Sequence, residues 1–402
     1  MLYTDNRMKH ILFVNDLPFN PHLGGIERVT DTIARGLVAR GYKVSYLCGK
    51  VSDAKALDYD FPATLFQLPQ PGLFASEENV AFYRRLLVEQ KIDVVINQRG
   101  LNRFMNTALC ADVKCISAVH SKPTAYADYK VWRLRYRKPG VTGLIKYALR
   151  QLFYPLVRYA TARRHYGAAR RQMEYIVKHS DAVVMLCNRY VSDVHNLGVV
   201  PGKGEARLLA INNPNSFDAP RTDVAKEREV LFVGRVDAVE KNTPRLVEVW
   251  QRIYAQLPDW RLTIVGDGPA MDNIKRFIER NGTERVALEG YQTNVRHYYE
   301  RASIVCLTSN FEGWPLAMIE GMQCGCVPFA FNTFGSAEEI IDHEQCGIIV
   351  EPDNIEQYAA RLVEVMSDDA KREAMSAAAR AKSQRWSSDA IVEQWVELIE
   401  SL

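Results

Sequence analysis

Short, uniformly apolar runs rich in β-branched residues recur along the chain, and segments with helical periodicity separate them. Strands that are apolar throughout, rather than alternating, are typical of parallel sheets covered by helices on both faces. Helical periodicity over 27–40 and 77–90 fits between them, so the first half of the chain predicts a doubly wound parallel sheet. The five runs of this half lie at 11–14, 44–47, 94–97, 115–119 and 182–187.

The same pattern then begins again. A polar, proline-containing stretch at 212–220 separates the two series and predicts a hinge. We therefore expect α/β architecture with two Rossmann-like domains, over 1–215 and 216–386, whose parallel sheets face each other across a cleft. We expect the helix at 387–402 to be able to pack back onto the first domain. The six runs of the second series lie at 230–233, 262–265, 286–288, 304–307, 327–331 and 348–350.

Composition excludes several classes of protein. Of the 402 residues, 47% are hydrophobic and 25% are charged, which is ordinary for a globular chain. No apolar run approaches the roughly 18 residues of a membrane-spanning helix. No apolar leader with a cleavage site precedes Met8, and the eight cysteines form no CxxC pair. These features predict a cytoplasmic protein with buried free thiols and an N-terminal extension at 1–7.

Glycines and cations follow the first strand of each predicted domain. Gly24 and Gly25 open a helix, where the backbone can approach an anion closely; a plain tight turn is an equally good interpretation of this pair. In the second domain Gly234 and Arg235 follow the strand directly, and Lys241 comes six residues later. A guanidinium and an ammonium at a strand end suit a diphosphate, although such a spacing is also common on solvated surfaces.

The most specific motif follows the predicted strand at 304–307 and reads FEGWPLAMIEGM over 311–322. Glu312 precedes a helix start at Pro315, and Glu320 lies on that helix, on the face of Leu316. A carboxylate, free helix N–H groups and a second carboxylate match the sugar, phosphates and ribose of a nucleotide sugar. Gly313 and Trp314 complete the loop. The alternative is an ordinary helix carrying one acid.

Together, Arg235, Lys241 and the two acids resemble the signature of the family 4 retaining glycosyltransferases of the GT-B fold. The resemblance covers most of the chain and is tightest over 230–351. It implies that Glu312 contacts the donor sugar, Glu320 the ribose, and Arg235 with Lys241 the diphosphate, without a metal or other cofactor.

The same resemblance implies that Gly24 and Gly25 form the N-terminal glycine loop, and that His120 lies near the donor sugar. By itself, a histidine that ends an apolar strand is more often a core residue. Tyr291 and Gln292 occupy the base-binding position. The chain departs from the family at Gly321, where alanine is usual, and at Trp314.

Other motifs of catalytic or metal sites are weak. The DxD sequence at 58–60 lies in a polar loop that does not follow a strand, so we interpret it as solvated rather than metal-binding. No His/Cys cluster in the sequence has the spacing of zinc ligands. A phosphorylase would require a pyridoxal-type lysine site, and none is recognisable. A GT-B-type epimerase remains an alternative to a glycosyltransferase.

Between residues 129 and 173 there is no acidic residue, whereas twelve are lysine or arginine. Residues 142–171 have the periodicity of an amphipathic helix, bent at Pro155. We expect residues 133–172 to bind an anionic membrane surface, near a glycan or lipid-linked acceptor at the inner face of the plasma membrane. A solvated arm packed on the first domain is the alternative. Nucleic-acid binding is disfavoured because it would not require Glu312 and Glu320.

Overall fold

The computed structural model describes residues 8–15, 24–49, 63–73, 75–98, 112–136, 154–202, 206–217 and 224–402. The predicted extension 1–7, the acidic loop 58–60, residues 137–153 of the basic segment and residues 218–220 of the hinge lie outside these ranges. By its contacts the chain divides into two units. The first comprises Met1–Phe19, Gly41–Ala210 and Leu402, and the second comprises Asn20–Arg40 and Ile211–Ser401.

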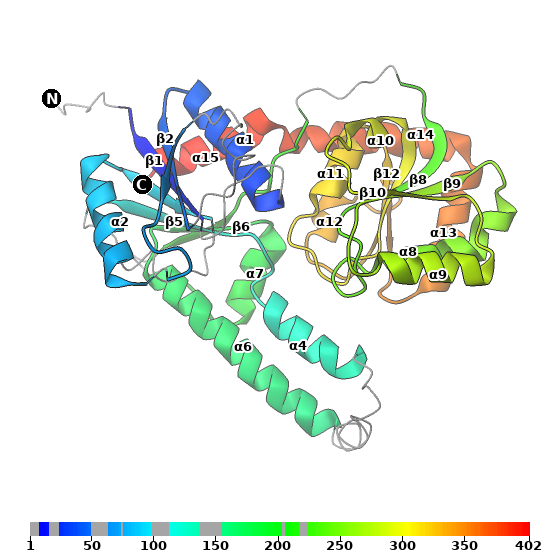
Figure 1. Ribbon diagram of the computed structural model, residues 1–402, viewed down its shortest axis with the longest axis horizontal. Coiled ribbons are helices and arrows are strands. Elements are labelled where there is room, and N and C mark those ends of the chain that lie inside the picture. Colours follow the sequence, from blue (N-terminus) through cyan, green and yellow to red (C-terminus); the bar gives the residue numbers. More distant parts are fainter. Residues whose placement is uncertain are drawn as a thin grey trace. The chain divides into compact units, whose positions relative to one another are not determined.

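A parallel sheet forms the centre of the first unit, with strands in the order β3-β2-β1-β4-β5-β6-β7 (Figure 1). All five predicted runs are strands of this sheet. Two edge strands escaped prediction, β3 and β7, because their side chains are only partly buried and their apolar runs are short. The strands are β1 (His10–Asn15), β2 (Lys43–Cys48), β3 (Thr64–Gln67), β4 (Val94–Asn97), β5 (Lys114–Val119), β6 (Ala182–Met185) and β7 (Arg207–Ala210).

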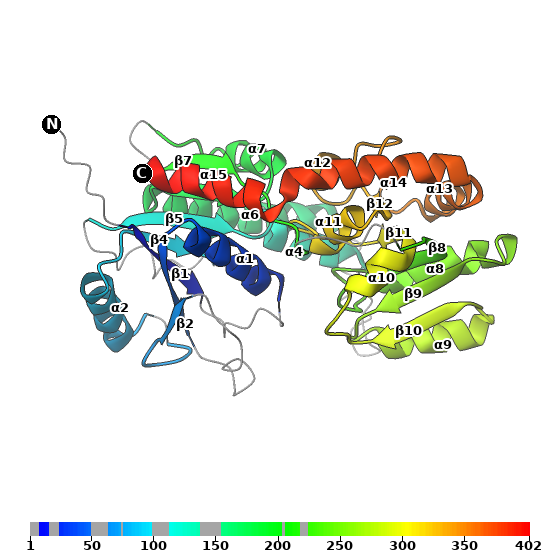
Figure 2. The same ribbon diagram turned by 90° about the horizontal axis from the view of Figure 1, so that it is seen from above.

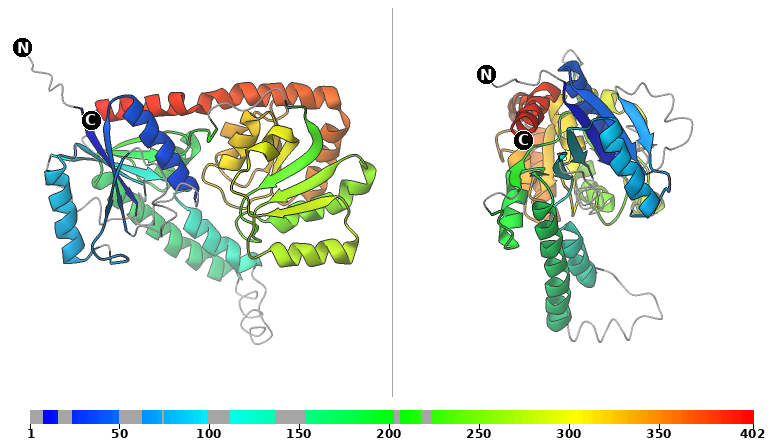
Figure 3. Two further views of the ribbon diagram at one scale, coloured as in Figure 1. Left: turned by 45° about the horizontal axis from the view of Figure 1, so that its top comes forward. Right: turned by 90° about the vertical axis from the view of Figure 1, so that its left-hand side faces the viewer.

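Four helices of this unit are described. Helices α4 and α6 pack against each other as a hairpin that extends away from the sheet (Figures 1 and 3). Pro155 lies in the first turn of α6, where its missing N–H leaves no helical bond unmade. The helices are α2 (Glu77–Glu89), α4 (Ala125–Tyr136), α6 (Tyr154–Lys178) and α7 (Asn188–Asn196).

The second unit is built on another parallel sheet, in the order β10-β9-β8-β11-β12-β13. All six predicted runs lie in it. Because β8 and β11 are neighbours, the chain reverses its direction of winding between them, and ligands of such sheets bind at the carboxyl ends of the strands near that point. The strands are β8 (Glu227–Val233), β9 (Arg261–Val265), β10 (Val286–Gly290), β11 (Ala302–Leu307), β12 (Val327–Phe331) and β13 (Ile348–Val350).

Helices cover both faces of the second sheet. Helices α8, α9 and α13 lie on one side of it and α10, α11 and α14 on the other (Figure 1). Their bounds are α8 (Thr243–Ile253), α9 (Met271–Asn281), α10 (Arg296–Arg301), α11 (Leu316–Gln323), α12 (Ala337–Ile340), α13 (Ile355–Ser367) and α14 (Asp369–Ser383), with short 3-10 turns η2 (Tyr254–Gln256) and η3 (Gln384–Trp386).

Two helices distant in sequence complete this unit. Helix α1 (Gly25–Ala39) runs beside α15 (Ser388–Glu400), as Figures 1 and 2 show. Their close approach depends on Gly36, because a Cβ there would lie 2.4 Å from Val392 Cγ2. Arg40 adds ion pairs to Asp389 and Glu393, each 3.4 Å long.

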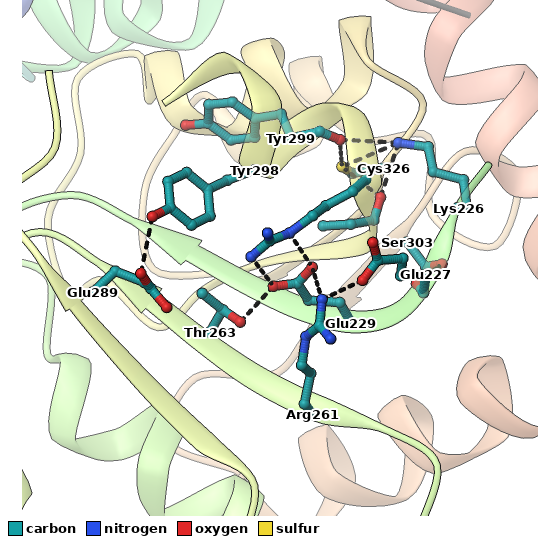
Figure 4. Close-up of polar contacts among 12 residues, drawn as sticks. Lys226, Glu227, Glu229, Arg261, Thr263, Glu289, Tyr298, Tyr299, Ser303 and Cys326 are labelled. Atoms are coloured by element: carbon teal, nitrogen blue, oxygen red, sulfur yellow. Dashed lines mark hydrogen bonds and ion pairs between the residues drawn. The ribbon is translucent and has the colours of Figure 1, made fainter. Parts of the chain in front are cut away.

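Glu229, on β8, is a fully buried carboxylate with three partners (Figure 4). Arg301 binds both of its oxygens, at 2.9 and 3.1 Å, and Arg261 and Thr263 add further bonds. Burial alone would raise the pKa of Glu229, but these bonds hold it below its usual value. The cluster therefore joins β8, β9 and the end of α10 through one ionised group.

The predicted character of the cysteines is confirmed for the seven that the structure describes, all of which are buried free thiols. Burial raises the pKa of Cys115 and of Cys306 to about 12, which leaves these thiols protonated. Within the described ranges, no helix combines the length and the apolar character needed to cross a bilayer.

Candidate active site

A cavity of about 670 Å³ opens at the carboxyl ends of β8, β9, β10 and β11 in the second unit. The starts of α1 and α11 also line it. Of the predicted donor-binding residues, Gly313 does not line the cavity, although its carbonyl accepts a bond from Ser336 Oγ. Those that do line it are Gly24, Gly25, Gly234, Arg235, Lys241, Tyr291, Gln292, Glu312, Trp314, Leu316 and Glu320.

Glycines give this end of the sheet its shape. Gly266, after β9, has a φ of +135°, and a Cβ there would lie 1.9 Å from the carbonyl oxygen of Gly234. The loops that follow β8 and β9 therefore approach each other too closely for side chains at this point. Both glycines line the cavity beside Arg235 and Lys241.

Arg235 is held by two carboxylates of its own loop. Its Nε donates to Asp237 Oδ2 at 3.0 Å, and its Nη2 donates to Glu240 Oε2 at 2.5 Å. Burial would lower the pKa of Arg235, but these acids raise it above its usual value, so the guanidinium stays charged. Asp237 also accepts three backbone N–H groups, of Val239, Glu240 and Lys241, and thereby fixes the loop that carries both cations.

Lys241 and Glu312 form an ion pair inside the cavity. Lys241 Nζ lies 2.7 and 2.9 Å from the two carboxylate oxygens, and Ser309 Oγ donates to one of them at 2.6 Å. The Glu312 side chain is only 7% exposed, and these two donors help to hold its orientation. A held carboxylate of this kind can accept bonds from sugar hydroxyls.

Glu320 lies on the cavity face of α11, as the four-residue spacing from Leu316 predicts. Its side chain is 3% exposed, and Arg28 Nη1 donates to its Oε1 at 2.8 Å. The helix itself begins at Leu316, with Pro315 as the N-cap, so the predicted start is one residue early. The N-terminus of α11 therefore lies in the cavity, between the two acids.

The predicted base-binding loop follows Gly290, whose φ is +66°. Tyr291 is 62% exposed. Gln292 Nε2 donates to the carbonyl of Glu289 at 2.8 Å, so this amide holds the loop rather than projecting from it. Trp314 packs edge-on against Trp386, at 5.3 Å between ring centroids. Trp314, at which the chain departs from the family pattern, thus supports the cavity wall.

His120 belongs to the first unit, where it follows β5. Its Nε2 lies 2.5 Å from Oε1 of Gln98, a buried residue that follows β4. The two side chains meet because β4 and β5 are neighbouring parallel strands that end at the same edge.

Several residues of the cavity were not singled out from the sequence. Arg28 and Tyr299 line it, and Ser309 orients Glu312. Arginine, tyrosine and serine are common on helices and loops, so their type alone does not mark these three residues as part of a site. Their place in the cavity depends on contacts with residues distant in sequence or on the fold of a loop. The GGIER sequence was the available signal for Arg28, since it places an arginine one turn into the helix that Gly25 opens.

Two family models match the chain. Residues 23–205 match the model described as Glycosyltransferase Family 4, and residues 216–382 match the model described as Glycosyl transferases group 1.

Curated relatives are similar over half of the chain. An uncharacterized glycosyltransferase of Haemophilus influenzae is 32% identical over 191 residues, which are 47% of this chain and 54% of that protein. A second relative, from Campylobacter jejuni, is the N-acetylgalactosamine-N,N'-diacetylbacillosaminyl-diphospho-undecaprenol 4-alpha-N-acetylgalactosaminyltransferase. It is 29% identical over 192 residues, 47% of this chain and 52% of that protein. The chain spans about half the length of these two relatives.

Solved structures share the fold over nearly the whole chain. The crystal structure of TarM has a TM-score of 0.75 at 15% identity, covering 98% of this chain and 99% of that one. The structure of Anabaena HepE in complex with UDP and glucose has a TM-score of 0.70 at 18% identity, covering 98% and 100%. With two parallel sheets, these likenesses show the GT-B fold. The two family models, which match residues 23–205 and 216–382, show that the chain belongs to the family 4 glycosyltransferases.

Proposed function

We propose that this chain transfers a sugar from a nucleoside diphosphate donor to a glycan or lipid-linked acceptor, with retention of anomeric configuration and without a metal. The observation that carries the proposal is the placement of Arg235, Lys241, Glu312 and Glu320 around one cavity at the carboxyl ends of the strands. Cations and acids in this order complement the phosphates, sugar and ribose of such a donor.

The cations would act on the leaving group. As the glycosidic bond breaks, negative charge accumulates on the departing diphosphate, and preorganised positive groups stabilise it without reorganisation. Arg235 and Lys241 are already oriented by Asp237, Glu240 and Glu312. We infer that the phosphates engage these two cations while the carboxylates keep them in place.

Retention is proposed through front-face attack. Glu312 is engaged by Lys241 and Ser309, an arrangement that suits hydrogen bonding to the sugar better than covalent attack on it. A donor phosphate oxygen then takes the proton of the acceptor hydroxyl. Analysis of the product by NMR tests this step, since an anomeric configuration opposite to that of the donor would exclude it.

The acceptor side of the proposal draws on a relative. The Campylobacter jejuni protein is named for a diphospho-undecaprenol-linked acceptor. We propose a glycan or lipid-linked acceptor for this chain too, in the synthesis of a polysaccharide. Such an acceptor would place the enzyme at the cytoplasmic face of the membrane.

The α4–α6 hairpin is the proposed membrane contact. On the described part of α6, Leu156 and Tyr159 are 67% and 66% exposed. The one acid of the facing helix, Asp128, is already engaged by Lys122 at 2.9 Å and by Thr124 at 2.8 Å. The outward surface is thus positive with aromatic and aliphatic groups, which complements anionic lipid. Arg170 on α6 pairs with the one acid of that helix, Glu174, at 2.7 Å. The exposed arginines of α6 are Arg158, Arg163, Arg164, Arg170 and Arg171.

Flotation with phosphatidylglycerol vesicles tests this contact. Arg163→Glu/Arg164→Glu should reduce binding about tenfold or more, since each basic residue contributes about 1 kcal/mol near such a surface. Lys275→Glu/Arg276→Glu, an equal charge reversal on α9, should bind like the wild type. Equal flotation of both variants would exclude the hairpin. Salt-sensitive binding to a single-stranded oligonucleotide, with none to vesicles, would favour nucleic acid instead.

Donor binding is tested by a thermal-shift screen of UDP-, GDP-, ADP- and dTDP-sugars, because a ligand that binds only the folded chain raises its melting temperature. We expect one base to stabilise the wild type and the shift to be lost in Glu320→Gln. Nucleoside diphosphate release that requires added acceptor indicates transfer. Release of the diphosphate at the same rate without acceptor would point to an epimerase.

A further inference from the structure

The loop at 239–242 carries Lys241 to the start of α8, and its backbone is bonded on two sides. On one side, the N–H groups of Val239, Glu240 and Lys241 donate to Asp237 Oδ1 at 2.8, 2.6 and 3.2 Å. Asp237 lies only a few residues before them, so these bonds fix the shape of the loop. They do not by themselves fix its place beside Glu312, which follows another strand, β11.

Asn310 bonds the loop from the second side. Its side-chain Nδ2 donates to the carbonyl of Val239 and its backbone N–H donates to the carbonyl of Glu240, both at 2.7 Å. Asn310 is 8% exposed and follows β11, whose neighbour in the sheet is β8 (Figure 2). Because Asn310 comes two residues before Glu312, it joins the segment that carries this acid to the loop that carries the cation.

Thr308 adds further contacts with the same loop. It is fully buried, and its Oγ1 lies 3.0 Å from the carbonyl oxygen of Asn242 and 3.4 Å from that of Lys241. Asn242 has a φ of +45°, a left-handed conformation that residues other than glycine seldom adopt. Such a conformation persists where the surrounding contacts hold it. Thr308 and Asn310 together thus hold the carbonyls of residues 239–242.

Lys241 depends on this support more than a rigid side chain would. A lysine ammonium is a point charge on a flexible four-carbon stem, so its position is set at the backbone and at its charged end. The charged end contacts Glu312, and the proposed donor phosphates would share it with that acid. The loop contacts then remain to fix the other end, at the Cα.

Neither Asn310 nor Thr308 lines the cavity. Any effect of these two residues on turnover must therefore pass through residues that do. We propose that Asn310 is a positioning residue, which together with Thr308 holds the backbone at 239–242 so that the Lys241 ammonium meets the departing diphosphate. The inference rests on the proposed function, in which Lys241 stabilises that leaving group. The alternative is that these bonds serve only the stability of the fold.

A double-mutant cycle between Asn310 and Lys241 tests the inference. The measured quantity is kcat for acceptor-dependent release of nucleoside diphosphate, at a temperature where each variant is folded. In the wild-type background Asn310→Ala should lower kcat about tenfold to a hundredfold, since a small misplacement of a catalytic group costs up to about that factor. In a Lys241→Met background the same change should lower kcat less than about twofold, because the group that Asn310 positions is already absent. A role in stability alone would give the same factor in both backgrounds.

Asn281→Ala is the matched control. Asn281 Nδ2 also donates to a backbone carbonyl, that of Phe277 at 2.8 Å, but it does so at the surface on α9. This control should leave kcat unchanged in both backgrounds. Should Asn310→Ala fail to fold, Thr308→Val removes the hydroxyl bonded to Asn242 and keeps nearly the same shape. It should lower kcat about threefold to tenfold, again only where Lys241 is present.

The outcomes separate this inference from the proposed function. Wild-type kcat in Asn310→Ala, or equal losses in the two backgrounds, would overturn the positioning role and leave the proposed function intact. Wild-type kcat in Lys241→Met would overturn the catalytic role of the cation and the inference with it. A wild type that releases no nucleoside diphosphate from any donor would overturn the proposed function itself, and the inference would fall too.

Discussion

Replacing Lys241 by methionine should remove a charge from the cavity with little change of shape. Methionine keeps most of the aliphatic stem and lacks the ammonium group. In the wild type, that group lies 2.7 and 2.9 Å from the two oxygens of Glu312, and the Lys241 side chain is 25% exposed. The substitution therefore affects both the stability of the site and its proposed chemistry.

Two magnitudes follow from this geometry. Glu312 would lose one of the two donors just described, and removing a charged partner from a nearly buried carboxylate costs about 1–3 kcal/mol of unfolding free energy. For turnover, loss of one preorganised group that stabilises transition-state charge costs about a hundredfold to a thousandfold in kcat. The larger loss should thus be catalytic.

The assay is steady-state release of nucleoside diphosphate in the presence of acceptor, well below the melting temperature of every variant. Ser309→Ala is the control, since it removes the hydroxyl that donates to Glu312 without removing a cation. We expect it to lose less than about tenfold in kcat. Near wild-type turnover in Lys241→Met would refute the proposed role of the cation. Equal losses in both variants would show that Lys241 acts only by orienting Glu312.

Three further results are expected. The folded-state pKa of Glu229 lies below the usual 4.5, so its ionised form stabilises the fold above that pH, and this stability is lost as the pH falls through the folded-state value. In urea titrations Glu229→Gln should therefore have a lower unfolding free energy than the wild type at pH 7, and that free energy should fall less steeply in acid. Equally steep falls in both proteins would contradict this. Gly321→Ala should lower the unfolding free energy by about 1–2 kcal/mol, because its Cβ would lie 2.7 Å from Val305 Cγ1. In a Val305→Ala background this loss should vanish. A similar loss in both backgrounds would show that the contact with Val305 is not its cause. Turnover should persist in EDTA, and a loss that Mg²⁺ restores would exclude metal-independent transfer.

Gly321 also shows how the structure explains a departure from the family pattern. The sequence shows glycine where alanine is usual, without a reason for it. In the structure the β-branched Val305 of β11 fills the space beside the helix, so only a glycine allows α11 to pack this closely. The glycine at position 321, which departs only mildly from the family pattern, thus leaves the space that the Val305 side chain occupies.

Much of the fold was predictable because parallel strands covered on both faces must be apolar along their whole length. The apolar runs of β1 and β8 are therefore recognisable in the sequence. The edge strands β3 and β7 are not, because their side chains are partly exposed to solvent and need not be apolar throughout. Helix α1 was predicted as a helix, but its close packing against α15 depends on one glycine and on residues more than 300 positions away.

For the candidate site, the sequence alone determined which chemical groups follow which strands. Arg235, Lys241, Glu312 and Glu320 were recognisable because strand ends and helix starts fix where a side chain can point. Only the tertiary structure decided their partners: Lys241 pairs with Glu312, 71 positions away, and Glu320 pairs with Arg28, 292 positions away. The physical reason is that charges and hydroxyls interact over a few ångströms of space, and local sequence patterns carry no record of such distances.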